Sequence, residues 1–107
     1  MTTITITVDD NVSASGEHAI VVSDLKQAKF WDTNTNNKGK VEGLDPGPGK
    51  IMYRIEGPIG DTYLIHLEGA ITASGKKNFI FGKIPKSTQV SPGRAVDINA
   101  RNLIILN

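Results

Sequence analysis

Three oxygen-bearing side chains stand at alternate positions in the most polar stretch of the chain. Asp32, Asn34 and Asn36 are spaced as the first ligands of a calcium-binding loop are, and carboxylate and amide oxygens are ligands that Ca²⁺ prefers. Asp45 or Glu42, further along the same stretch, would complete the shell. The sequence therefore predicts a candidate calcium site at Asp32, Asn34, Asn36 and Asp45.

The same stretch departs from the helix-flanked calcium loop at two positions. The sixth position of that loop requires Gly and holds Asn37, and the twelfth requires Glu and holds Gly43. The alternative is a polar loop whose Asn and Asp side chains bond to their own backbone. We predict no obligatory cofactor, with calcium as a candidate ion.

A second candidate site combines one aromatic ring with neighbouring amides. Trp31, Asn34, Asn36 and Asn37 together offer a stacking surface and several hydrogen-bonding groups, a mixture that suits a carbohydrate. The alternative is that Trp31 belongs to the core, because only 6% of the residues are aromatic and such a chain needs its rings inside. A lectin-like module, with or without calcium, is the alternative function.

Patterns that support catalysis are missing from the sequence. The serines lack a nucleophile-elbow pattern, and cysteine is absent, which removes thiolate chemistry. His66 and Glu68 alternate on one predicted strand, where we expect them to face Met52 and Lys50 as parts of an ordinary polar surface. We therefore predict that the protein is not an enzyme.

The charge balance and the N-terminus limit the partners. With 12 Lys+Arg against 11 Asp+Glu, the net charge of +1 gives no electrostatic argument for nucleic acid or an anionic membrane. Lys76 and Lys77 beside two phenylalanines give only a weak nucleic-acid signal. The sequence shows neither a signal peptide nor a membrane-spanning run, which favours a cytoplasmic or virion-associated location.

The element predicted to organise the fold is a hairpin over residues 50–68. Two alternating runs flank Gly-Pro-Ile-Gly, and a loop over 57–61 would set Ile55 opposite Tyr63, Tyr53 opposite Ile65 and Ile51 opposite Leu67. Cross-strand pairs of this kind stabilise a sheet. Residues 2–8, 18–22, 79–82, 96–99 and 103–106 also alternate or are continuously apolar, as strands are.

Two segments are predicted to be less regular. Residues 23–31 fit either a short helix or one helical turn that leads into a strand at 29–31. Residues 32–49, rich in Asn, Gly and Pro, are expected to form a long loop that holds both candidate sites, with a small hairpin near Asn37 and no regular structure at 46–49. About eight strands in one domain, 1–107, predict an all-β sandwich of Greek-key or jelly-roll type, with a partly open barrel as the alternative.

The terminal strands suggest what such a module does. Residues 2–8 and 103–106 are predicted to be edge strands, which are templates for pairing with another chain; the alternative is that they pair with each other. We therefore predict a non-enzymatic binding or structural module that self-associates or docks on a protein partner, such as a virion or appendage component or an inhibitor of a host partner.

Overall fold

The computed structural model describes residues 1–10, 18–35 and 37–107. The described part contains eleven strands and one 3-10 turn. In chain order they are β1 (Thr2–Asp10), β2 (Ala19–Ser23), β3 (Ala28–Phe30), β4 (Asp32–Thr35), β5 (Lys38–Leu44), β6 (Gly47–Pro58), β7 (Thr62–Glu68), β8 (Ala70–Thr72), β9 (Phe79–Lys83), η1 (Lys86–Thr88), β10 (Gln89–Ser91) and β11 (Arg94–Ile105).

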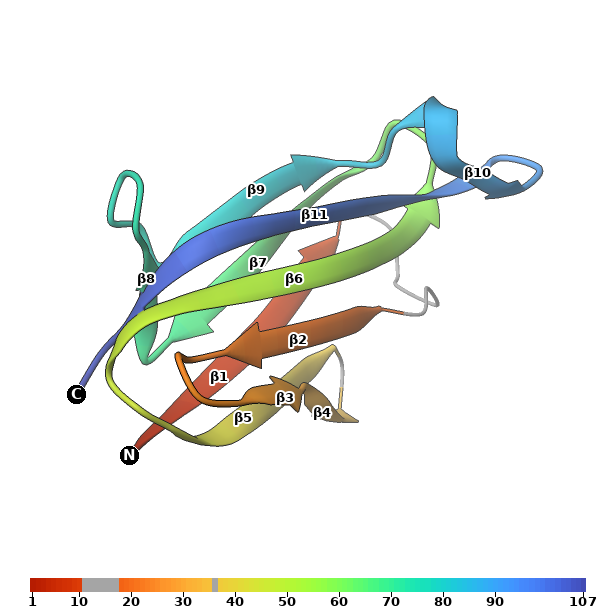
Figure 1. Ribbon diagram of the computed structural model, residues 1–107. Helices are drawn as coiled ribbons and strands as arrows, with labels where there is room; N and C mark the ends of the chain where they lie inside the picture. Colours follow the sequence, from red (N-terminus) through yellow and green to blue (C-terminus); the bar gives the residue numbers. More distant parts are fainter. Residues whose placement is uncertain (11–17, 36) are drawn as a thin grey trace.

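The strands form two antiparallel sheets that pack face to face (Figure 1). Sheet A has the order β4-β5-β1-β7-β9, and sheet B has the order β10-β11-β6-β2-β3, with β8 also paired to β11. Both sheets are open, which confirms the predicted all-β sandwich and not the barrel. The short strands β3, β4, β8 and β10 raise the strand number above the predicted eight.

The core lies between the sheets and is built from aliphatic side chains at alternate positions. In β1, Ile4, Ile6 and Val8 are buried, as the strict alternation predicts. The predicted edge position of this strand is wrong, because β1 pairs with both β5 and β7. Nor does β1 pair with β11, which belongs to the other sheet. The Thr2 hydroxyl near the start of β1 donates to the carbonyl of Leu106, the residue after β11.

The predicted hairpin over 50–68 does not form. β6 pairs with β11 and β2 in sheet B, whereas β7 pairs with β1 and β9 in sheet A, so the intervening turn crosses from one sheet to the other. All six predicted apolar side chains are nevertheless buried, because each run turns its apolar face to the shared interior. Alternation decides which face of a strand is buried, but it does not decide whether the facing residue is a neighbour in the ladder or lies across the core.

Hydrogen bonds hold the crossing turn in place. Ile59 N–H donates to the Gly93 carbonyl at 3.0 Å, and Gly60 N–H donates to the Ile84 carbonyl at 3.0 Å. Gly60 has a φ of 91°, which favours glycine. The backbone groups of the turn therefore bond to two other connections rather than closing a two-strand ladder.

The predicted long loop over 32–49 is mostly strand. Its residues form β4, β5 and the first part of β6, and the small hairpin expected near Asn37 joins β4 to β5. Pro48 pairs in register with Ile104, although 46–49 was expected to be irregular. β2 pairs with residues 50–54 of β6, so on the side away from β11 no described strand lies beside residues 47–49. Such an edge tolerates a proline, which has no N–H to donate.

The segment 23–31 matches the second of its two predicted conformations only in part, because a strand does follow, at Ala28–Phe30, but residues 24–27 do not form a helical turn. Asp24 forms a side-chain-capped turn, with Oδ1 accepting from the N–H groups of Lys26 and Gln27 at 2.8 Å each, and β3 follows at once. Its Oδ2 also accepts from the Asp45 N–H at 2.8 Å. One carboxylate therefore ties the β2–β3 turn to the connection between β5 and β6.

Candidate functional site

The three phenylalanines of the chain lie on its surface. Phe30 is 80% exposed, Phe81 is 58% exposed and Phe79 is 37% exposed. The core holds Tyr53 and Tyr63 instead. Exposed large apolar side chains gathered on one face point to a surface that contacts something other than water.

The largest such gathering lies on the outer face of sheet B. The registers of four strands set Phe30 beside Val21, Val21 beside Met52, and Met52 beside Ala100, in one row across the sheet. The next row holds Ala19, Arg54 and Ile98. We call the apolar members of both rows the outer patch: Ala19, Val21, Phe30, Met52, Ile98 and Ala100.

The outer patch has a raised end and a hollow. Small side chains, Ala19 and Ala100, leave a hollow of about 470 Å³ beside Met52, which is 45% exposed, and Ile98, which is 65% exposed. Phe30 stands at the other end of its row, on β3 at the margin of the sheet. A projecting ring and a shallow, open hollow thus occupy one face.

Charged groups flank the outer patch on both sides along the strand direction. Lys50 lies in the row on one side, opposite Ser23 and Asn102. On the other side, Glu56 forms ion pairs with Arg54 at 3.4 Å and with Arg94 at 3.6 Å. The patch is therefore an apolar area with a polar rim, as protein interfaces have.

The outer face of sheet A has a different character. Lys38, Thr7, His66 and Phe79 form one row across it, and His66 Nε2 lies 3.0 Å from Asp9 Oδ2. Met52 and Lys50 were the expected neighbours of His66 and Glu68. This prediction is wrong, because Met52 and Lys50 lie on β6 in sheet B whereas His66 and Glu68 lie on β7 in sheet A. Sheet A thus presents polar groups over β5, β1 and β7, and two exposed phenylalanines, Phe79 and Phe81, at its β9 edge.

One polar contact crosses the sandwich interior. The Tyr63 hydroxyl on β7 donates to Asp97 Oδ2 on β11. Burial raises the pKa of the Tyr63 hydroxyl far above its ordinary value, and the bond to the Asp97 carboxylate raises it further. This contact is a link between the two sheets in which the tyrosine remains protonated at neutral pH.

Two of the four predicted calcium ligands, Asp32 and Asp45, lie apart along β5. Asp32 pairs with Lys40 on β5, whereas Asp45 follows the far end of that strand, five residues or about 16 Å along an extended chain. The Asp45 carboxylate lies 3.4 Å from Lys26 Nζ. Asn36 and the side chains of Asp32 and Asn34 lie outside what the structure describes. Among described residues, no group of three or more His, Asp or Glu side chains is placed to hold a metal ion.

The predicted carbohydrate site is described only in part. Trp31 is half-buried and packs against the core, in keeping with the alternative weighed for it. Asn37 lies in the β4–β5 turn with a φ of 57°, and its carbonyl accepts from the Val8 N–H at 2.9 Å. Asn34 and Asn36 have no described side chains. The lectin-like function stays a prediction.

Sequence reasoning overlooked the outer patch, although a signal for it exists. The apolar residues on both faces of 18–22 indicate a strand flanked on both sides, and β2 does lie between β3 and β6. Ala19 and Val21 form the second apolar face of this strand. Together with Met52 and Ile98 at the outward positions of their strands, this face marks an apolar outer surface.

Comparison with protein-family models, with curated proteins and with solved structures found no match. The function is therefore argued from the residues of this chain. Within the residues that the structure describes, no helix has the length and apolar character needed to cross a bilayer.

Proposed function

We propose that the protein is a non-enzymatic structural module that self-associates through the outer face of sheet B. The observation that carries the proposal is the row formed by Phe30, Val21, Met52 and Ala100, which keeps apolar side chains on the water-facing side of four adjacent strands. An antiparallel sheet with one solvated face ordinarily places polar residues there.

The shape of the outer patch favours a second copy as the occupant. Phe30 projects at one end, and the hollow between Ala100, Ala19 and Met52 lies toward the other end. A two-fold axis parallel to the strands, passing between β2 and β6, lays Phe30 of each copy over the hollow of the other. This is the reciprocal contact of an isologous dimer.

The size of the outer patch sets the strength of this dimer. The centres of the four strands span about 14 Å and the two rows are about 7 Å apart; with the width of the outermost strands and rows included, the patch measures about 19 Å by 14 Å, or a few hundred Å². A standard interface buries about 800 Å² on each partner. We therefore expect a transient dimer, with a dissociation constant between about 10 µM and 1 mM. Weak contacts of this type build larger assemblies when many copies are held together.

Sedimentation equilibrium between about 10 µM and 2 mM tests the proposal, because this range brackets the expected dissociation constant. The weight-average mass of the wild type should rise from 11.5 kDa toward twice that value. Met52→Glu places a carboxylate in the centre of the outer patch and should weaken dimerisation at least about tenfold, since removing that carboxylate from water against the apolar face of the other copy costs more than about 1.4 kcal/mol.

The matched control is Thr7→Glu, which introduces the same charge on the outer face of sheet A. Its neighbours Lys38 and His66 favour a carboxylate there, so this variant should fold and self-associate as the wild type does. A wild type that stays monomeric throughout the range, or equal loss of dimer in both variants, would contradict the proposal.

A further inference from the structure

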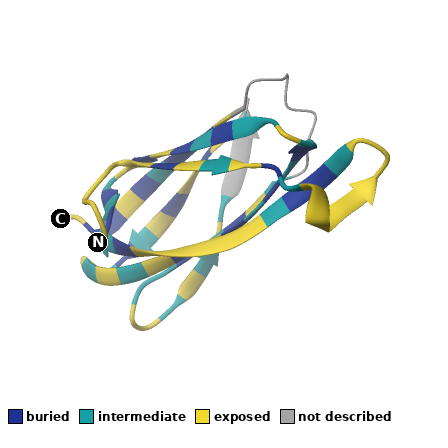
Figure 2. Cartoon of the chain, turned by 90° about the horizontal axis from the view of Figure 1, so that it is seen from above, coloured by how far each residue is buried: buried dark blue, intermediate teal, exposed yellow. Residues whose placement is uncertain are grey.

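Along the edge of β11 that faces away from β6, two short strands pair with its ends and leave its middle without a strand neighbour among the described residues. β8 pairs with residues 103–105, and β10 pairs with Arg94 and Ala95. Between these two short strands, residues 96–102 have β6 as their one strand neighbour in the described part of the chain. Figure 2 shows the exposed middle of this strand, on the way to the projecting β10–β11 turn.

The main-chain groups in this gap point outward. Ala73 N–H donates to the Asn102 carbonyl at 2.9 Å, so Asn102 directs its backbone groups away from β6. The β6–β11 register is uninterrupted, and backbone direction alternates along a strand, so Ile98 and Ala100 direct theirs the same way. Ala100 N–H bonds to the neighbouring Asn99 Oδ1 at 3.0 Å instead of to a strand.

The gap has a defined length. At one end the Asn102 carbonyl is occupied by Ala73, and at the other the Val96 carbonyl accepts from the Thr88 hydroxyl. The five residues between them, 97–101, span about 17 Å. A full strand from a second copy of this sandwich would collide with β8 and β10 at the two ends. A short extended segment whose ends turn away from the sheet fits.

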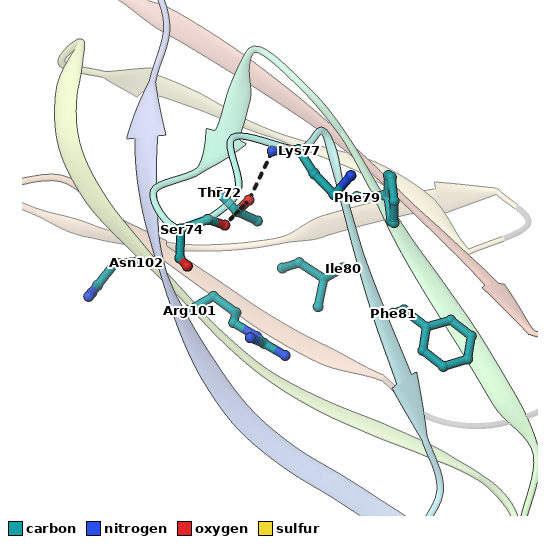
Figure 3. Close-up of a pocket in the computed structure, with 8 residues that line it drawn as sticks. All are labelled: Thr72, Ser74, Lys77, Phe79, Ile80, Phe81, Arg101 and Asn102. Carbon is teal, nitrogen blue, oxygen red and sulfur yellow. Dashed lines mark hydrogen bonds between the residues drawn. The ribbon is translucent and has the colours of Figure 1, made fainter.

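The interior side of the gap opens into a second hollow. A space of about 250 Å³ lies between β11, the β8–β9 connection and β9 (Figure 3). Ile80 from β9 and Arg101 from β11 point toward it, and Lys77 borders it. Both charged residues of this lining are cationic. Alternate side chains of an added strand would enter this hollow, one against Ile80 and one beside Arg101.

We propose that the gap in β11 binds an extended segment of a partner protein by strand addition. The segment runs antiparallel to β11, pairs with Ile98 and Ala100, and carries an acidic residue opposite Arg101 followed at alternate positions by apolar residues. Main-chain hydrogen bonds supply the affinity, and the hollow with its two cations supplies the selectivity. This site goes beyond the proposed self-association, because it uses the edge of sheet B and not its outer face.

Two capped five-residue peptides test the proposal by NMR titration. The probe is acetyl-Glu-Thr-Val-Thr-Val-amide, which sets Glu opposite Arg101 and valines toward the hollow, and the control replaces its Glu by Lys. The probe should shift the Ile98 and Ala100 amide signals, slow their hydrogen exchange, and bind at least about fivefold tighter than the control. Arg101→Glu should reverse this preference between the two peptides.

A backbone variant tests the pairing itself. Ala100→Pro removes the outward N–H without removing a bond to β6, a position where an edge strand tolerates proline. Ala100→Pro should abolish probe binding, while Ala100→Ser should retain it. Thermal unfolding establishes that both variants are folded. If the proline variant does not fold, the reversed peptide preference of Arg101→Glu tests the proposal in its place.

The two proposals fail separately. Met52→Glu should bind the probe as the wild type does, even where it no longer dimerises. No shift at Ile98 and Ala100 with about 5 mM probe, a concentration above the weakest affinity expected of a specific strand pairing, would overturn strand addition. Equal binding of both peptides to wild type and Arg101→Glu would overturn it as well.

Discussion

Tyr53 and Tyr63 meet edge to face across the interior of the sandwich, with ring centroids 6.5 Å apart and planes at 73°. Tyr53 belongs to β6 in sheet B and Tyr63 to β7 in sheet A, so the contact joins the sheets rather than two rungs of one hairpin. Aromatic pairs in this arrangement stabilise beyond the area they bury. The Tyr63 hydroxyl then continues to Asp97, which makes this residue the main polar link between the layers.

Gly82 leaves the space that the Tyr63 ring occupies. The two residues are paired in register, and a Cβ on Gly82 would lie 2.2 Å from the Tyr63 Cζ and hydroxyl oxygen. Gly82→Ala should therefore lower the free energy of unfolding by about 2–3 kcal/mol, the cost of overpacking a filled interior. Urea denaturation measures this loss.

Gly57→Ala is the matched control for that change. Gly57 also lies in a strand at the interior, but a Cβ there would meet Ile84 at 3.5 Å, an ordinary contact. Its free energy of unfolding should equal or slightly exceed that of the wild type, because alanine restricts the unfolded chain. Equal losses in both variants would contradict the packing assigned to Tyr63.

Removal of the Tyr63 hydroxyl should cost stability in a pH-dependent way. Tyr63→Phe deletes the bond to Asp97 and should lower the free energy of unfolding by about 1–2 kcal/mol at pH 7. The folded-state pKa of Tyr63 is raised above its ordinary value of 10.0, so its contribution is present below pH 10 and is lost as the pH rises beyond that value. The difference between wild type and variant should therefore shrink above pH 10, as thermal unfolding at several pH values will show. A difference that grows with pH would contradict this.

Asp24 should govern acid stability. Hydrogen bonds from the backbone N–H groups of Asp45, Lys26 and Gln27 hold the pKa of its carboxyl well below its ordinary value of 3.8. A folded-state pKa that is depressed gives stability that is present above the unfolded value and is lost as the pH falls. The wild type should therefore lose melting temperature below about pH 4.

Asp24→Asn is the variant that isolates this effect. An amide keeps one acceptor oxygen but sets its NH₂ group against an N–H donor, so the variant should melt below the wild type at pH 7. The difference in melting temperature should close as the pH falls below 4, because the Asp24 carboxylate of the unfolded wild-type chain then accepts a proton while that of the folded chain does not. A difference in melting temperature that is unchanged down to pH 2 would contradict the role assigned to Asp24.

The apolar alternation of the strands was sufficient to predict the sandwich. Ile4, Ile6 and Val8, like the six apolar residues of β6 and β7, are buried as the period of two requires. Strand partners were not predictable in the same way, because two inward-facing runs bury the same side chains whether they are ladder neighbours or lie across the core. The turn at 58–61 contains Gly60-Asp61, a pair that two-residue hairpins use, so the local signal favoured the hairpin that does not form.

Composition was a poorer guide to the segment 32–49 and to the surface. Asn, Gly and Pro there were read as loop residues, but main-chain pairing with β1 and β11 holds β5 and the start of β6 as strands, because tertiary contacts outweigh local preference. The phenylalanines were not expected outside, since low aromatic content argues for burial. Only the register across β3, β2, β6 and β11 shows that Phe30 and Met52 share one exposed face.

The central claim is that the outer face of sheet B is the surface through which copies of the protein meet. The most direct test follows the ¹H–¹⁵N NMR signals of the wild type on dilution from about 2 mM to 20 µM, a range that brackets the expected dissociation constant. We predict concentration-dependent shifts at Val21, Phe30, Met52, Ile98 and Ala100, with none at Thr5, Thr7 and His66 on sheet A. Signals that do not move, or that move on sheet A instead, would contradict the account.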